Sequence, residues 1–291
     1  MIGSLTPLAA LNGMAIGISI SESDQLSSFG IDKHTVNLAV RELAMAIIGQ
    51  GGRVVFGHDW RENGVMVDIF EFAISHRGVG SERSRSDRPP ISNYVAWPCK
   101  TSIDDDSQKR FAEVIAVHEV KPPLAPNHAM LSETNRQVWS ARSLSHMRLA
   151  MTQACDARIC LGGKVAGYSG CAAGIVEEAY LALQHGQPLF ISSIFGGASA
   201  EFIRQLEGEP LEQEGVFGPD AETQAPVIDA LTSDDTQLNT QSVTKWGLRR
   251  LSQTNYLTFE ENRKLFAATQ IQEVVGWMLL GLGRAQSRRV Q

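Results

Sequence analysis

The sequence lacks the features of several protein classes. Its four cysteines form no Cys-x-x-Cys pair and have no histidines at metal-ligand spacing. No run of about 18 apolar residues is present, so we expect no membrane span. No basic segment followed by an apolar run marks a signal peptide. The net charge of -6 argues against a general nucleic-acid binder. We therefore expect a cytoplasmic protein with reduced core cysteines, no bound metal and no cofactor.

Length and composition are those of an α/β protein. The 291 residues are 43% hydrophobic and 20% charged, which is enough apolar material for a full core. Buried-strand patterns occur at residues 14–20, 53–56, 94–97, 111–117, 158–161 and 188–192. Helical spacing occurs at residues 35–49, 65–75, 133–154, 174–185 and 199–206. Alternating strands and helices predict a Rossmann-like open, mostly parallel sheet with helices on both faces.

The composition changes after residue 206. We predict a nucleotide-binding domain over residues 1–206, an acidic linker or surface excursion over 207–238 and a helical extension over 239–291. Residues 270–282 carry a wide apolar stripe at helical spacing. This stripe can pack on its own domain or form the interface of a homo-oligomer, a dimer or a multiple of one, and the sequence leaves both open.

Three predicted strands end in glycine-rich or small polar turns, of which residues 161–178 (LGGKVAGYSGCAAGIVEE) form the most informative. Ligands of open parallel sheets bind at the carboxyl ends of the strands. Glycine lets the backbone approach a ligand, and a helix N-terminus attracts phosphate. A single such turn is usually only a turn, and a loop lysine is often only solvated, but three turns favour a binding site. The candidate ligand-binding residues are Ser19, Ser21, Gly57, His58, Gly64, Gly162, Gly163, Lys164, Gly170 and Gly174.

The turn at residues 161–178 also resembles a known motif. Residues 156–163 (DARICLGG) and 174–178 (GIVEE) resemble the PGGxGTxxE region of the "lonely guy" phosphoribohydrolases, and residues 57–64 resemble their second glycine turn. The resemblance covers about residues 13–205 and implies a member of the SLOG superfamily. That superfamily includes nucleotide-processing enzymes and ligand sensors, some of them in prokaryotic anti-phage systems.

The sequence departs from this motif at several positions. An insertion separates Gly163 from Gly174, the motif proline is missing, and Ile175 replaces the motif threonine. Glu178 stands at the position of the motif glutamate. Arg148 falls near the family's catalytic arginine, one residue out of phase. The resemblance implies that Glu178 and Arg148 would carry the chemistry if the protein is an enzyme.

These observations leave three functions open. The first is a binding protein that senses a nucleotide or a nucleotide-derived molecule, through a partner chain or by self-assembly. The second is a hydrolase that cleaves the N-glycosidic bond of nucleoside 5′-monophosphates. The third is a structural protein without a ligand. The altered phosphate loop and the additional helices favour the first.

Overall fold

The structure is a computed structural model of the whole chain. It describes residues 10–23, 25–57, 69–75, 88–97, 99, 105–122, 132–232 and 238–289. His58 and Gly64, two of the candidate ligand-binding residues, lie outside these ranges.

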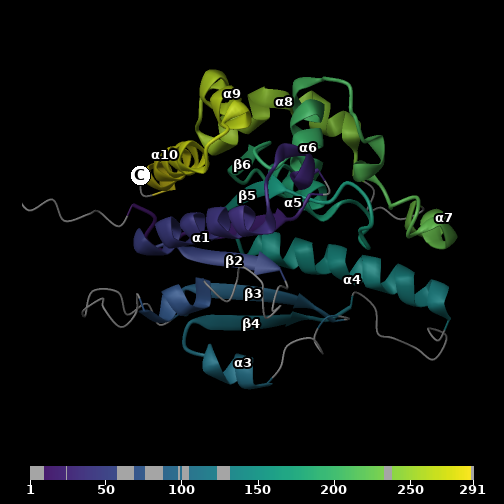
Figure 1. Cartoon of the computed structure of the whole chain (residues 1–291), viewed down its shortest axis with the longest axis horizontal. Helices are drawn as coiled ribbons and strands as arrows, with labels where there is room; N and C mark the ends of the chain where they lie inside the picture. Colours follow the sequence, from purple (N-terminus) through teal and green to yellow (C-terminus); the bar gives the residue numbers. More distant parts are fainter. Residues whose placement is uncertain are drawn as a thin grey trace, which may run out of the picture.

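The described residues form one sheet of six parallel strands in the order β4-β3-β2-β1-β5-β6 (Figure 1). The strands are β1 (Ala15–Ser21), β2 (Arg53–Gly57), β3 (Ile91–Ala96), β4 (Ile115–Val120), β5 (Ala157–Gly162) and β6 (Leu189–Ser192). The order reverses between β1 and β5, which pair from Ile16 with Ala157 to Ser21 with Gly162. The predicted Rossmann-like fold is confirmed, and its topological switch point lies between these two strands.

Helices cover both faces of the sheet. The chain between β1 and β6 contains η1 (Leu26–Phe29), α1 (Lys33–Gly49), α3 (Asp105–Arg110), α4 (Glu133–Gln153) and α5 (Gly174–Gln184). After β6 come α6 (Gly197–Glu207), η4 (Glu214–Phe217), η5 (Ala225–Val227), α7 (Ile228–Thr232), α8 (Thr240–Asn255), α9 (Phe259–Ala267) and α10 (Ile271–Arg289). Residues 69–75 are also helical. Asp32 and Ser132 accept hydrogen bonds from the first turns of α1 and α4, so each helix starts at a side-chain cap.

The two faces of β1 differ in side-chain size. Ile16 and Ile18 point into the main core, which also contains buried residues of α1 and α10. The opposite face carries Ala15, Gly17 and Ser19, all small, since side chains alternate along a strand. Space therefore remains on the second face for larger side chains from β5, α4 and α5.

The C-terminal helices pack on this same sheet. Val274, Met278 and Leu282 of α10 are fully buried in the main core. The apolar stripe predicted for residues 270–282 is thus covered within the chain, by α1, α9 and the sheet. No helix in the described ranges is both long enough and apolar enough to cross a membrane.

The described part of the acidic segment, residues 207–232, is a packed excursion. Val216 and Phe217 join the core formed by α5 and α6, and Val227 and Leu231 pack against α4. Asp220 is buried and accepts a hydrogen bond from the backbone N–H of Gly167, 2.9 Å away. The excursion therefore stabilises the glycine-rich loop of residues 161–178.

Two expectations for the edge of the sheet are wrong. The strand expected at residues 111–117 begins only at Ile115, because residues 111–114 form a turn whose apolar Phe111 and Val114 are buried. The strand expected at residues 94–97 begins earlier, at Ile91, with buried Ser92 and Asn93 next in line. Strand boundaries are difficult to predict from an apolar pattern where the strand contains buried polar residues or the adjoining turn contains buried apolar residues.

The close packing of α10 gives a first testable prediction. A Cβ at Gly281 would lie 2.2 Å from Cε1 of Phe190, whereas a Cβ at Gly283 meets no atom within 4 Å. We expect Gly281→Ala to lower the free energy of unfolding by roughly 1–3 kcal/mol through overpacking. The control Gly283→Ala should raise it by about 0.5–1 kcal/mol, the usual helix preference for alanine. Urea unfolding at low protein concentration measures both, and equal effects would contradict this packing.

Candidate functional site

The loops that follow β1 and β5 touch at the switch point. The carbonyl of Ser21 accepts a hydrogen bond from the N–H of Gly163 at 3.0 Å. Gly162 has φ of +66°, and a Cβ there would lie 2.7 Å from the Ser21 carbonyl oxygen. Only glycine fits this crossing, because both the backbone angle and the contact exclude a side chain.

The backbone N–H and carbonyl of Gly163 both form hydrogen bonds within the protein. Its N–H bonds to Ser21, and its carbonyl accepts from the N–H of Ala198 at the start of α6, 3.0 Å away. A Cβ at this residue would lie 2.6 Å from Cγ1 of Ile175. Gly163 therefore shapes the loop, and its N–H is already bonded within the chain.

The backbone N–H groups at the N-termini of α5 and α6 differ in their hydrogen-bond partners. In α6 the N–H of Gly197 donates to Oε1 of Gln25 at 3.0 Å, and the N–H of Ala198 donates to Gly163. In α5 the N-cap residue is Ala173, and no side chain caps the helix. The first turn of α5 thus presents backbone N–H groups and the positive end of the helix dipole toward the switch point.

Arg148 of α4 reaches this helix end. A Cβ at Gly170 or Gly174 would lie 2.5 or 2.8 Å from its Nη1 or Nη2, so the guanidinium packs against both glycines. Nη1 donates to the carboxylate of Glu177, and Nε lies 3.7 Å from Oε1 of Glu178. Burial acts to lower the pKa of Arg148, but the two carboxylates outweigh it and raise that pKa. The arginine is a permanent cation beside a positive helix end.

A second arginine lies beneath the first. Arg158 of β5 is fully buried, and its Nη1 donates to the hydroxyl of Ser19 at 3.1 Å and to Oε2 of Glu178 at 2.9 Å. Its Nη2 donates to the hydroxyl of Thr152 at 3.1 Å. The guanidinium occupies the space beside Gly17, where a Cβ would lie 2.7 Å from Cζ. The small residues of β1 thus accommodate a buried cation.

The four charges form one neutral network of two arginines and two glutamates. Oε2 of Glu178 accepts from the Ser19 hydroxyl as well as from Arg158, while Oε1 faces Arg148. The Glu178 side chain is 13% exposed, so solvent weakens these contacts little. A buried charge is tolerated only with such partners. The network holds the Glu178 carboxylate between β1, β5 and α4.

Comparison with family models decides the family. The model of SLOG cluster2 matches residues 10–265, nearly the whole chain. This chain belongs to the SLOG cluster2 family. A search of the curated proteins finds no match. The SLOG assignment made from the glycine-rich turns is confirmed, and the chain is a SLOG-type, nucleotide-related protein.

The structure of this SLOG cluster2 protein brings most of the candidate residues together. Ser19, Arg148 and Glu178 share the charge network, and Gly170 and Gly174 pack against Arg148. Gly162 and Gly163 lie at the crossing with the β1 loop instead. Ser21 and Lys164 are exposed. Gly57 is separate: it ends β2 beneath α4, where its Cβ would lie 3.2 Å from Cε of Met147. Within the described ranges no three histidine, cysteine, aspartate or glutamate side chains gather as a metal site.

Sequence reasoning missed Arg158, Glu177 and the matching Gly17. One signal was available, because a charged residue inside an otherwise apolar strand must find a partner. The partner itself lies 20 residues away in α5, and Gly17 lies on a neighbouring strand. Neither could be identified before the strand register was known.

The contact between Gly17 and Arg158 can be tested by a double-mutant cycle. Gly17→Ala should cost roughly 1–3 kcal/mol of unfolding free energy, because the methyl group meets the guanidinium. Arg158→Met should cost about 3–5 kcal/mol, because it leaves Glu178 short of a partner. In the Arg158→Met background, Gly17→Ala should cost at least about 1 kcal/mol less. Strictly additive effects in denaturant unfolding would show that the two residues do not meet.

Proposed function

We propose that this SLOG protein binds a nucleotide or a nucleotide-derived molecule at the switch point and keeps it intact. The anionic group of the ligand lies at the N-terminus of α5, close to Arg148, with Lys164 at the rim. The remainder of the ligand lies over the carboxyl ends of β1 and β5, the usual place in an open parallel sheet.

The observation that carries the anion site is the position of Arg148. Its guanidinium rests on Gly170 and Gly174 at an uncapped helix N-terminus. A cation at the positive end of a helix dipole is unfavourable unless negative charge is nearby. Glu177 supplies one such charge, and an anionic ligand would supply another. Lys164, exposed in the same loop, adds a flexible cation that suits a phosphate.

The hydrogen bonds and ion pairs of the Glu178 carboxylate support ligand binding in preference to hydrolysis. A general base needs a lone pair directed at the substrate or at a water molecule. Here one carboxylate oxygen accepts two hydrogen bonds, and the other faces a guanidinium. Glu178 acts as a counter-ion in this arrangement, although it stands at the position of the motif glutamate.

Titration with a panel of nucleotides tests this function. We expect calorimetry to detect binding of at least one nucleoside monophosphate, triphosphate or cyclic nucleotide, and chromatography to recover it unchanged. Release of free base would instead identify a hydrolase, and Glu178→Gln should then slow release by roughly 100-fold. No binding to any member would refute the proposal.

A substitution of Lys164 tests where the anion lies. Lys164→Ala should weaken the affinity for the nucleotide identified by the panel about tenfold, the effect of losing one charge-assisted hydrogen bond. The matched control is Lys109→Ala, which removes an exposed lysine from α3. Equal nucleotide affinities of the two variants would show that the anion does not bind at this loop.

The wider role is also a proposal. The resemblance to SLOG ligand sensors supports a function in anti-phage signalling through an effector partner chain. Buried Cys155 and Cys160, which form no disulfide, support a cytoplasmic location. Burial raises the pKa of the Cys155 thiol to about 11, so it stays protonated and unreactive.

A further inference from the structure

We propose that the outward face of α10 is a self-association surface, on which α10 of a second copy packs in the antiparallel direction. We define this face by Glu273, Gly276, Leu280, Gly283 and Ser287, which recur at spacings of three and four residues. It lies opposite the buried stripe of the same helix. Leu280 is 39% exposed at its centre.

Two glycines on this face make no close packing contact within the protein. A Cβ at Gly276 or at Gly283 would meet nothing within 4 Å, in contrast to Gly281, which packs on Phe190. Glycine within a helix is less stable than alanine. The distance between packed helices depends on the side chains at the contact. Glycines that face open space in mid-helix suit the close approach of another helix.

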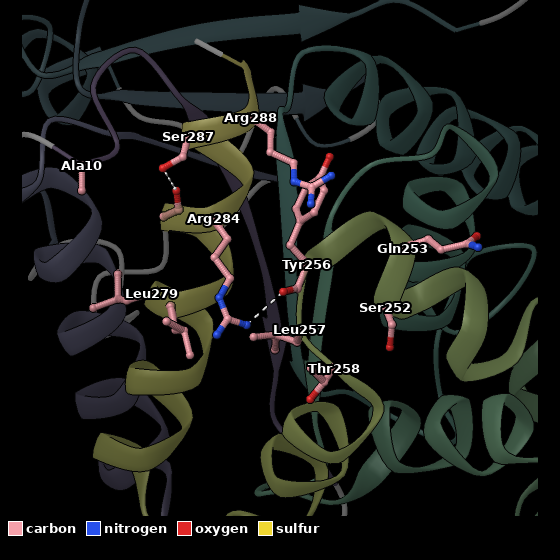
Figure 2. A pocket seen from close by; sticks show the side chains of 12 residues that line it. Ala10, Ser252, Gln253, Tyr256, Leu257, Thr258, Leu279, Arg284, Ser287 and Arg288 are labelled. Carbon is pink, nitrogen blue, oxygen red and sulfur yellow. Dashed lines mark hydrogen bonds between the residues drawn. The ribbon is translucent and has the colours of Figure 1, made fainter. Parts of the chain in front are cut away.

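A wide groove covers the C-terminal half of this face. It has a volume of about 1590 Å³, and residues of α10, the end of α8, residues 256–258 and Ala10 line it (Figure 2). Small-molecule pockets usually measure about 300–1,000 Å³, so this groove is large for such a ligand. Its volume is comparable to that of about four turns of a helix about 10 Å wide. A groove of this volume is consistent with a helix of a second copy as its occupant.

The charges on α10 are complementary to those of an antiparallel copy. Glu273 lies near the start of the helix and Arg288 near its end. With a two-fold axis close to Leu280, residue 273 of one copy lies opposite residues 287 and 288 of the other. Two symmetric ion pairs then join Glu273 to Arg288 of the second copy. Arg288 lies at the groove, 5.0 Å from the centre of the Tyr256 ring, whereas Arg284 is held by Glu261.

Charge reversal tests this arrangement. Light scattering and sedimentation equilibrium should show a dimer at micromolar concentration. Glu273→Arg and Arg288→Glu should each weaken it by about tenfold or more, because each places like charges together twice. The double variant Glu273→Arg/Arg288→Glu should restore the affinity. Glu209→Arg, which reverses an exposed charge after α6, is the control and should change nothing.

A second variant separates association from folding. Gly283→Ala should raise the melting temperature of the monomer, because alanine favours the helix, yet weaken the dimer. A wild-type protein that stays monomeric would overturn the proposal, as would single charge reversals without effect or a double variant without rescue. Hydrogen exchange can also show whether residues 1–9 occupy the groove. If the backbone amides of the groove lose their protection when residues 1–9 are removed, this segment is the occupant, and the proposal is overturned.

Discussion

The ion pair between Arg158 and Glu178 is the constraint on which the candidate site depends. A guanidinium enclosed in the centre of a sheet is stable only if its charge is balanced and its terminal nitrogens find acceptors. Ser19, Thr152 and Glu178 supply the acceptors from β1, α4 and α5. Gly17 supplies the space. One buried cation thus fixes the relative positions of the four elements that surround the switch point.

This constraint also divides the roles of the two arginines. Arg158 holds Glu178 against β1, and Glu177 with Glu178 holds Arg148 at the N-terminus of α5. The network itself is neutral, so the positive end of the α5 dipole and the exposed Lys164 supply the attraction for an anion, and Glu178 serves as a counter-ion. This arrangement supports our proposal that the site binds an anion without breaking its covalent bonds.

Much of the fold could be predicted from the sequence, because apolar runs and helical spacing alternate clearly through residue 206. The motif around Glu178 also indicated the correct strand, loop and helix. The role of Arg158 depends on strand register, which brings Gly17 beside it and cannot be inferred from local pattern. Val216 and Val227 escaped notice for a related reason. Isolated apolar residues in an acidic segment gain significance only when α5, α6 and α4 are near enough to bury them.

A structure of the protein with a bound nucleotide tests the central claim most directly. We predict that the anionic group lies at the N-terminus of α5 beside Arg148, that the glycosidic bond is intact, and that Glu178 still bonds to Arg158 and Ser19. A structure in which Glu178 has left Arg158 and points at the anomeric carbon of the ligand would contradict the claim.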